Sequence, residues 1–528
     1  MNAKLLSFIS LVSFSSTIQS ATESEEQRKH PNILFCIADD AGHMSAYGTP
    51  WISTPSFDRV AKEGLLFEHA YTCNAKSAPS RATIITGRNS WQLKEACNHW
   101  PKFPAEFKSY PETLSENGYY VGCTGKGWGP GITNDTNGNP RELTGKMWNQ
   151  KKLVPPTQGI SNVDYAANFN EFMKNRPEGK PFCFWYGALE PHRGYEYASS
   201  LRFGKSVSQI DSVPNYWPDN EIVRIDMLDY TIEIEHFDHH LEEILEILEE
   251  TNELDNTIII VTSDHGMPFP RCKGQEYNNS NHIPFAVMWK NGIKNPGRKI
   301  KEYIGTIDIA PTISEVTGIN LEKAGMKTIT GRSFMDILKN IKANIDRDYV
   351  MIGKECHDVG RPDDQGYPIR GLIRGDFLYL KNFKIDRWPA GNPETGYMNV
   401  GGGPTKTKIL KARRNPDTAH YWQLSFGKRE TEELYNIKKD PNCMINLAKK
   451  NEYKEIMQKL EQEMTQKLVE QKDLRSFGKG YIFDSYPDVS KAKQVWNRMK
   501  AGEKVPCLWI EKTDFEPEAS GLKVNWQK

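Results

Sequence analysis

A hydroxyl group and a guanidinium group lie close together in residues 77–81, which read S-A-P-S-R, and T-G-R follows at residues 86–88. Pro79 fixes its own φ and favours an extended Ala78, so we expect Ser77 to lie on a tight turn. A helix can begin near Pro79, and the free N–H groups of its first turn favour an anion. The segment could therefore bind a tetrahedral oxyanion, although ordinary helix capping would produce the same pattern.

Acidic residues follow two of the most apolar runs in the chain, residues 31–38 and residues 257–262. The polar residues found after these runs are Asp39, Asp40, Asp264 and His265. Such runs are expected of strands buried on both faces of a parallel sheet, and ligands gather outside the carboxyl ends of these strands. Adjacent carboxylates repel each other unless a cation or protons neutralise them, and hard oxygen ligands suit Ca²⁺ or Mg²⁺. A metal site is one interpretation, and capping of the following helix is the other.

In order and spacing, S-x-P-S-R, four residues and T-G-R resemble the signature of the formylglycine-dependent sulfatases in its serine-type form. The resemblance implies that a serine-type sulfatase-maturing enzyme oxidises Ser77 to formylglycine after translation, and that the hydrated aldehyde is the nucleophile. It also implies one Ca²⁺, bound by Asp39, Asp40, Ser77, Asp264 and His265. An imidazole prefers softer metals than calcium, but a D-H-G variant occurs in the family.

The same resemblance assigns roles to Arg81, Lys126, His192 and Lys273. Arg81 lies in the signature and Lys126 matches the G-K motif after a strand, and both would orient and stabilise the hydrated aldehyde. His192 matches the P-H motif, and Lys273 matches the basic residue downstream of D-H-G. Either would protonate the leaving group of the sulfate.

Trp128 departs from the family pattern, because most relatives carry a histidine two places beyond the lysine of the G-K motif. That histidine is credited with acting on the hydrated aldehyde. We expect His43, in the D-D-A-G-H loop, or His99 to take its place.

Three further histidines, at positions 236, 239 and 240, have the i, i+3, i+4 spacing that places side chains on one face of a helix. Such a set could hold a metal. Because the set lies in the middle of a predicted helix rather than at a strand end, we interpret it as a solvated or packed helix face.

Among sulfatases, the chain looks most like the heparan N-sulfatase (sulfamidase) group. The segments that carry this resemblance are S-D-H-G-M-P-F-P at 263–270, E-P-H-R at 190–193, and H-D-V at 357–359 with Y-P-I-R at 367–370. The last two would bring a second domain over the active site. The candidate substrate contacts are His99, Arg193, His357, Arg361 and Arg370. Arginine forks suit uronate carboxylates, and surface turns and salt bridges are the alternative.

The resemblance leaves the substrate open. The sulfated glycan could be a glycosaminoglycan or an algal polysaccharide such as ulvan, and the bond could be an O-sulfate or an N-sulfate. Two other classes also stay open: a phosphodiesterase-like hydrolase of the same metal-dependent superfamily, and an inactive protein that binds sulfated glycans. The phosphodiesterases lack the S-x-P-S-R and T-G-R signature.

Strand-like and helix-like segments alternate through the first part of the chain. The expected strands are 31–38, 118–122, 181–186 and 257–262, and the expected helices are 57–66 and 224–250. This alternation predicts an α/β domain with a mostly parallel sheet flanked by helices, which is alkaline-phosphatase-like by the resemblance. We assign residues 21–345 to this catalytic domain.

Residues 346–528 have a different texture, with short extended pieces separated by Gly, Pro and Asp turns. The extended pieces are 349–352, 370–373 and 377–380, and a helix is expected near 452–471. We predict a smaller α+β domain that carries an antiparallel sheet.

The first twenty residues are typical of a signal peptide, with Lys4 before an apolar run at 5–14. The run is too short to span a bilayer, and no later stretch is apolar enough to do so. We therefore expect a periplasmic or secreted protein without a membrane span.

The charge balance limits the partners that the chain can attract. The chain has 528 residues, of which 68 are acidic and 68 are lysine or arginine. These equal numbers offer no electrostatic reason for binding nucleic acid or an anionic membrane. Any anion site must therefore be a local pocket.

Overall fold

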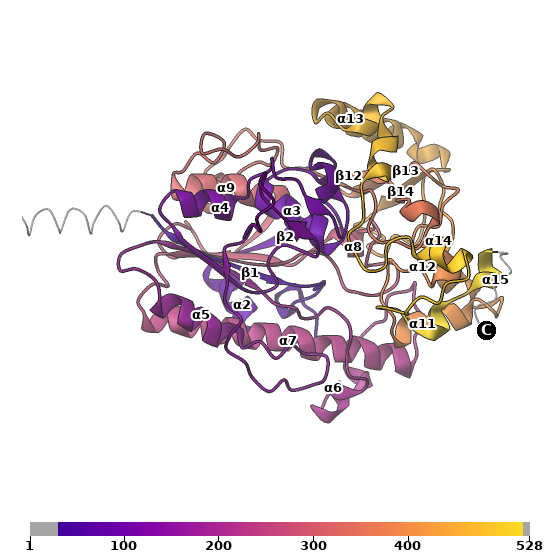
Figure 1. Ribbon diagram of the computed structural model, residues 1–528, viewed down its shortest axis with the longest axis horizontal. Helices are drawn as coiled ribbons and strands as arrows, with labels where there is room; N and C mark the ends of the chain where they lie inside the picture. Colours follow the sequence, from indigo (N-terminus) through magenta and orange to yellow (C-terminus); the bar gives the residue numbers. More distant parts are fainter. Residues whose placement is uncertain (1–29, 521–528) are drawn as a thin grey trace, which may run out of the picture.

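The computed structural model describes residues 30–520, and its largest element is an eight-stranded sheet (Figure 1). The strands are β1 (Asn32–Ala38), β2 (Leu65–Tyr71), β4 (Tyr120–Gly125), β6 (Lys146–Met147), β7 (Phe182–Gly187), β8 (Thr257–Ser263), β9 (Phe285–Met288) and β10 (Arg298–Gly305). Their order is β10-β2-β9-β8-β1-β7-β4-β6. Among these eight strands, β9 alone runs antiparallel to its neighbours. The predicted α/β domain with a mostly parallel sheet is therefore confirmed.

Helices cover both faces of this sheet (Figure 1). One layer contains α2 (Pro55–Glu63), α5 (Tyr165–Lys174) and α7 (Glu221–Glu250), and the other contains α3 (Ser77–Thr86), α4 (Tyr110–Glu116) and α9 (Ile309–Thr317). Side chains of β1 alternate between the layers: Leu34 and Cys36 pack with the first, and Ile33 and Phe35 with the second. All of β1 is buried, which explains its continuous apolar sequence.

A four-stranded antiparallel sheet lies in the C-terminal part of the chain. Its strands are, in spatial order, β11 (Tyr349–Lys354), β12 (Ile369–Arg374), β13 (Phe377–Asn382) and β14 (Glu432–Asn436), and α13 (Lys454–Glu470) packs against it. The two sheets share one hydrophobic cluster, in which Tyr71 and Cys73 join Val350 and Ile352. The predicted antiparallel sheet is confirmed, whereas the domain boundary at residue 345 stays a prediction.

The remaining elements are short and lie in the connections. They are α6 (Ser199–Arg202), α8 (Asn278–Asn281), α10 (Met335–Leu338), α11 (Pro404–Ala412), α12 (Ala419–Phe426), α14 (Val495–Lys500), α15 (Pro517–Ser520), β3 (Lys102–Phe103) and β5 (Ile132–Thr133). The predicted signal peptide lies outside the described residues.

The helix predicted over residues 57–66 is wrong at its C-terminal end. It ends at Glu63, and β2 begins at Leu65. Gly64 separates the two elements, and a Cβ at this position would lie 2.0 Å from the carbonyl oxygen of Val287 on β9. The apolar spacing continued across the boundary because α2 packs against the sheet and β2 is one of its buried strands.

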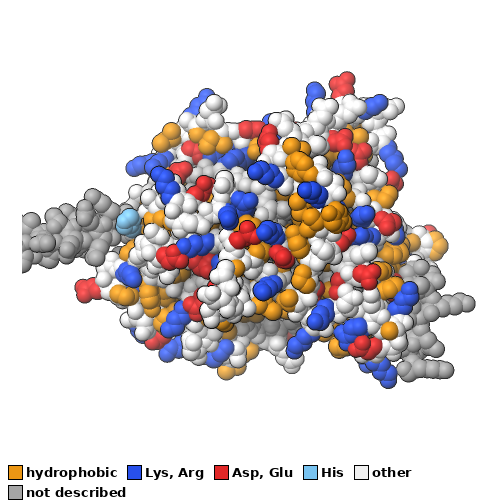
Figure 2. All heavy atoms as spheres, turned by 45° about the horizontal axis from the view of Figure 1, so that its top comes forward, with side chains coloured by type: hydrophobic (Ala, Val, Ile, Leu, Met, Phe, Trp, Pro, Cys, Tyr) orange, Lys and Arg blue, Asp and Glu red, His pale blue; other side chains and the backbone are white. Residues whose placement is uncertain are grey.

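The face of the molecule shown in Figure 2 carries acidic and basic side chains interspersed with apolar ones. No large area of a single charge is visible on that face. Across residues 30–520, no helix combines the length and the apolar character needed to cross a membrane.

Two glycines bring β4 and β7 close together where both strands end. Gly125 has a φ of +72°, and a Cβ there would lie 2.0 Å from the carbonyl oxygen of Gly187. A Cβ on Gly187 would in turn lie 1.9 Å from the carbonyl oxygen of Lys126. The N–H of Lys126 donates to the carbonyl of Gly187 at 2.6 Å. This close approach fixes the point at which the Lys126 side chain leaves the sheet.

We predict that Gly125→Ala strongly destabilises the protein, because it adds a steric clash to a left-handed backbone. Gly118 is a matched control, since it has a φ of +98° and a Cβ there meets nothing within 4 Å. Gly118→Ala should therefore lower the free energy of unfolding only through backbone strain, by about 1–3 kcal/mol. Gly125→Ala should lower it by a further ~1–3 kcal/mol because of the clash. Denaturant unfolding of both variants measures the difference, and equal losses would contradict the clash.

Candidate active site

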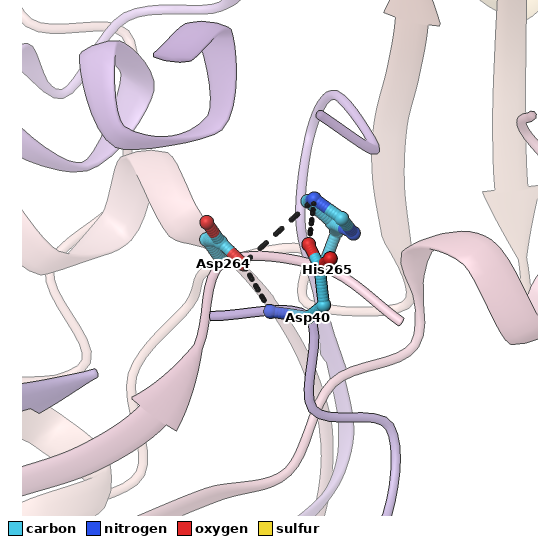
Figure 3. A group of neighbouring side chains, drawn as sticks. All are labelled: Asp40, Asp264 and His265. Atoms are coloured by element: carbon cyan, nitrogen blue, oxygen red, sulfur yellow. Dashed lines mark hydrogen bonds and ion pairs between the residues drawn. The ribbon is translucent and has the colours of Figure 1, made fainter. Parts of the chain in front are cut away.

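The carboxyl ends of β1 and β8 bring acidic residues and a histidine together. The two strands are parallel neighbours with Ala38 opposite Ser263, so the residues that follow them meet at one edge of the sheet. The N–H of Asp40 donates to Asp264 Oδ1 at 2.9 Å, and Asp40 Oδ1 lies 2.7 Å from His265 Nε2 (Figure 3). All three side chains are buried.

Two atoms of this group are suited to bind a metal ion. Asp40 Oδ1 and His265 Nε2 are buried and face each other at 2.7 Å, and no other described residue forms a hydrogen bond with either atom. One ligand atom from each of Asp40, Asp264 and His265 lies within 4.8 Å of the other two. Buried polar atoms without partners are costly, and carboxylate oxygens suit hard divalent cations. The set therefore fits a divalent metal ion.

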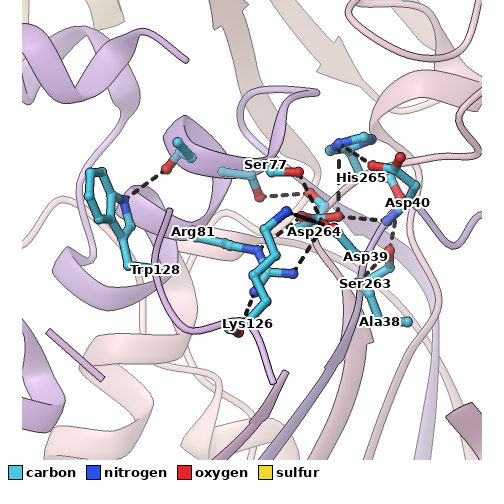
Figure 4. Close-up of polar contacts among 12 residues, drawn as sticks. Ala38, Asp39, Asp40, Ser77, Arg81, Lys126, Trp128, Ser263, Asp264 and His265 are labelled. Carbon is cyan, nitrogen blue, oxygen red and sulfur yellow. Dashed lines mark hydrogen bonds and ion pairs between the residues drawn. The ribbon is translucent and has the colours of Figure 1, made fainter. Parts of the chain in front are cut away.

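Ser77 begins α3, two residues earlier than predicted, and lies beside the acidic group (Figure 4). Its hydroxyl donates to Asp39 Oδ1 at 3.1 Å. One turn later, Arg81 donates from Nε to Asp264 Oδ2 at 3.0 Å and from Nη2 to Asp39 Oδ1 at 3.2 Å. The i, i+4 spacing on one helix thus places a hydroxyl and a buried guanidinium against the same carboxylates.

Two lysines complete the charge balance of the site. Lys126 Nζ lies 2.8 and 2.6 Å from the two carboxylate oxygens of Asp39, and Lys273 Nζ donates to Asp40 Oδ2. Together with Arg81, they set three basic groups against three buried carboxylates. Buried charges are tolerated when they are paired in this way.

The pKa values of the carboxyls reflect this balance. Burial opposes ionisation, but Lys126 holds the pKa of Asp39 well below its usual range, and Lys273 does the same for Asp40. Burial and the neighbouring Asp39 raise the pKa of Asp264. Three carboxylates in contact still repel one another, and a divalent cation would relieve that repulsion.

A cavity of ≈ 750 Å³ adjoins these groups, within the range of about 300–1,000 Å³ that is common for ligand sites. The sequence-predicted site residues that line it are Asp39, His99, Lys126, His192, Arg193 and Lys273. Trp100, Trp128 and Trp509 add flat apolar surface to its walls. The cavity therefore combines several basic groups with aromatic walls.

His192 and Arg193 follow β7 and line the cavity together. Desolvation by the surrounding protein and the charge of Lys273 lower the pKa of His192, although the side chain itself is exposed. Arg193 forms a two-pronged ion pair with Asp226 of α7, at 2.8 and 2.7 Å, and donates to the carbonyl of Pro268 at 2.9 Å. The guanidinium is therefore fixed beside the cavity, with its charge paired by Asp226.

Trp128, at the position where the sequence resemblance led us to expect a histidine, donates from Nε1 to the carbonyl of Ala78 at 3.1 Å. Of the two histidines predicted to take over, His99 lines the cavity. His43 packs against Trp51, with ring centroids 5.1 Å apart, and is not among the described residues that line the cavity. Placement thus favours His99 over His43.

Two charged residues of the cavity wall were missed by the sequence analysis. Lys76 directly precedes Ser77, and its Nζ lies 2.5 Å from Asp358 Oδ2. Asp358 also forms a hydrogen bond with His99 Nδ1 at 2.8 Å. Although burial alone would raise it, Lys76 and His99 lower the pKa of Asp358 to about 2. Lys76 could have been noticed in the sequence beside Ser77, whereas its pairing with the distant Asp358 leaves no local signal.

Arg361 and Arg370, predicted to contact the substrate, are not among the described cavity-lining residues. Arg370 is 0% exposed and donates to Glu355 at 2.6 Å and to Asp473 at 2.9 and 3.0 Å. Arg361 is buried and donates to the backbone carbonyls of residues 388 and 389. Their placement argues against direct substrate contact, because both guanidinium groups already bind the protein itself.

His357 was predicted as a further substrate contact and is likewise absent from the described lining residues. It is buried, and its Nε2 lies 2.5 Å from Asn74 Oδ1. The motif context could not separate these cases, since an arginine fork or an imidazole binds a protein group as readily as a substrate group.

We predict that Arg370→Met lowers the free energy of unfolding by about 3–5 kcal/mol, because two buried carboxylates lose their partner. Arg374, on the same strand, pairs with Asp346 and Glu463 at the surface, and Arg374→Met should cost less than about 1 kcal/mol. Denaturant unfolding and steady-state kinetics check both. A raised KM in Arg370→Met with unchanged stability would instead support substrate contact.

Comparisons with known proteins identify the family of the chain. The family model described as Sulfatase matches residues 31–319. An ulvan-active sulfatase of Formosa agariphila is 27% identical over 84% of this chain and 81% of its own length, and human N-sulphoglucosamine sulphohydrolase is 25% identical over 82% and 89%. A solved structure described as a complex with its substrate D-glucosamine-2-N,6-O-disulfate superposes with a TM-score of 0.57 at 19% identity, over 84% of this chain and 98% of the other. The chain belongs to the sulfatase family.

Proposed function

We propose that this chain is an exported sulfatase that removes sulfate groups from a sulfated polysaccharide or its oligosaccharides, with formylglycine at position 77 and one Ca²⁺. The observation that carries the proposal is the contact of the Ser77 hydroxyl with Asp39, in a site where Arg81 binds Asp39 and Asp264. This arrangement joins a nucleophile position, fixed positive charge and a metal-ligand set at one end of the sheet. Export rests on the predicted signal peptide.

Position 77 as a hydrated aldehyde would supply two hydroxyl groups, one to attack sulfur and one to expel the sulfate afterwards. An unmodified serine has no second hydroxyl, so it would be sulfated once and not released in this way. Arg81 and Lys126 would orient the group through the charges that they direct at Asp39. Their positive charges would also stabilise the negative charge that develops on the sulfate oxygens.

The residues that would hold Ca²⁺ are Asp39, Asp40, Asp264 and His265, together with residue 77. When bound, the cation would act as a Lewis acid on a sulfate oxygen and would orient the nucleophile. The buried Asp40 Oδ1, which contacts the candidate ligand His265 and no other described residue, supports this assignment. His265 is the soft member of the set, and three carboxylates supply the hard oxygen donors.

The leaving group would be protonated by His192 or by Lys273, which both line the cavity. The pKa of His192 is lowered in the unliganded site, with desolvation and the charge of Lys273 as causes. An anionic sulfate would offset that positive charge and raise the pKa of the ring, so substrate binding itself would help His192 to carry a proton.

The sugar would lie against the remaining cavity wall. Arg193 and the linked residues Lys76, Asp358 and His99 offer charged and hydrogen-bonding groups to it. Both a glycosaminoglycan and an algal polysaccharide such as ulvan stay candidates, as do O-sulfate and N-sulfate bonds. Desulfation of a panel of defined sulfated oligosaccharides tests the choice.

The second candidate is a protein that binds sulfated glycans without cleaving them. It is favoured by one observation, the tryptophan at position 128 where the sequence resemblance led us to expect a histidine. The two candidates differ in the chemical state of residue 77, which the next experiment measures.

We predict that the peptide containing Ser77 has a mass about 2 Da below the serine form after co-expression with a serine-type maturing enzyme, because oxidation removes two hydrogens. Mass spectrometry checks this, and the same chain expressed without the maturing enzyme is the control. Ser77→Ala should abolish turnover of sulfated oligosaccharides. Full turnover in Ser77→Ala, or in protein with unmodified Ser77, would overturn the proposed chemistry.

We also predict that Ca²⁺ stabilises the folded protein, by about 2.7 kcal/mol at a free concentration of ~100 Kd. Thermal unfolding after chelation and after addition of Ca²⁺ measures the effect. Asp40→Asn should lose it, whereas Asp238→Asn should keep it, because Asp238 is a buried carboxylate that binds the N–H groups of Ser56 and Phe57 instead. An equal response of both variants to Ca²⁺ would place the ion elsewhere.

A further inference from the structure

A second group of metal-ligand side chains lies between α5 and α7, which run side by side in one helical layer (Figure 1). Asp164 caps the N-terminus of α5, and His240 and Glu243 lie one turn apart on α7. One ligand atom from each residue lies within 4.8 Å of the other two. None of the three is among the described residues that line the active-site cavity.

His240 has no satisfactory partner in this position. The side chain is 2% exposed, and neither ring nitrogen has a hydrogen-bond partner among the described residues. The ring of Tyr165 packs edge-on against it at 5.1 Å, and the ring of His236 lies 4.7 Å away. His236 Nε2 is also buried without a partner. Burying an imidazole with both nitrogens unpaired is costly, so His240 calls for a compensating interaction.

The spacing of the donor atoms is compatible with metal ligands. His240 Nδ1 lies 3.2 Å from Glu243 Oε2, a contact that would pair the two groups only if the ring were protonated. Two donors bound to one tetrahedral Zn²⁺ at about 2.0–2.2 Å lie about 3.3 Å apart. Asp164 Oδ1 accepts from the N–H of Ala167, and no described residue donates to its other oxygen. Each of the three side chains therefore has an atom available to a metal.

We propose that Asp164, His240 and Glu243 form a transition-metal site that takes Zn²⁺. Imidazole nitrogens combined with carboxylate oxygens suit Zn²⁺, whereas Ca²⁺ takes oxygen ligands. The site is separate from the metal group at the strand ends and does not depend on the proposed sulfatase chemistry.

The position of the site gives it a structural role. Asp164 follows the segment that contains Ser161 and Asn162, which line the active-site cavity. The hydroxyl of Tyr165 donates to Glu190, another cavity residue, at 2.7 Å. A metal ion bound by Asp164 and by α7 would therefore stabilise the position of the cavity-lining segment 161–162 relative to α7.

His239 shows what an ordinary histidine on the same helix does. Its side chain is 61% exposed and lies 3.6 Å from Glu242 and 3.8 Å from Glu243, as expected of a surface ion pair. The sequence-based interpretation is a solvated or packed helix face. His239 is on the solvated part of that face, and the buried His240 beside it packs against Tyr165.

The test uses the full-length protein saturated with Ca²⁺, so that the strand-end site does not compete for Zn²⁺. Equilibrium dialysis with metal analysis should find one Zn²⁺ per chain, and Co²⁺ should give the visible absorption of a tetrahedral site. His240→Ala should weaken Zn²⁺ binding about 100-fold or more, since loss of even an outer partner of a metal ligand costs 10–100-fold. His239→Ala is the matched control and should bind as the wild type does.

Glu243→Gln is the second variant, since Glu243 is half-exposed and its replacement leaves the core intact. It should also lose Zn²⁺ affinity, and Zn²⁺ should raise the Tm of the wild type and of His239→Ala but not of Glu243→Gln. The proposal is overturned if the wild type binds no Zn²⁺, or if His239→Ala, His240→Ala and Glu243→Gln bind it equally.

Discussion

Three buried carboxylates in contact with one another form the constraint around which this molecule is built. Asp39, Asp40 and Asp264 would repel each other in an apolar interior, and a guanidinium and two ammonium groups, from three different segments, balance them. Arg81, Lys126 and Lys273 come from different segments of the chain. Their ion pairs with the buried carboxylates therefore help to hold these segments in place. Within the same balance, Asp40 Oδ1 and His265 Nε2 lie 2.7 Å from each other, and with Asp264 they form a group that could hold a metal ion.

The regular geometry of the parallel sheet brings these residues together. Two parallel strands, β1 and β8, end at the same level, so the residues after them meet without any special loop. The helix that begins at Ser77 directs its first turn at the same edge, and Arg81 follows one turn later on the same face. Two facing glycines let β4 and β7 approach closely enough to deliver the lysine. The chemistry of the site thus depends on backbone geometry as much as on the identity of its side chains.

The C-terminal antiparallel sheet contributes to the wall of the cavity through Asp358, which lies between β11 and β12. Its link to the first part of the chain is partly apolar, through the shared cluster around Tyr71 and Val350, and partly ionic, through Lys76, Asp358 and His99. The ionic link lies at the cavity and holds His99 by its Nδ1. Arg370 also comes from this sheet, but it stabilises the sheet from within, between two carboxylates.

Most of the fold and the centre of the site could be predicted from the sequence, because buried strands and strand-end carboxylates leave local patterns. Burial on both faces makes β1 and β8 continuously apolar, and the acidic residues that follow them are adjacent in the chain. Which arginine faces a substrate and which faces a protein carboxylate was decided only by tertiary structure, as Arg370 shows. The sequence also does not show that Lys76 pairs with Asp358, or that Asp164 lies beside His240. Long-range pairing depends on how distant segments pack, and no local spacing records it.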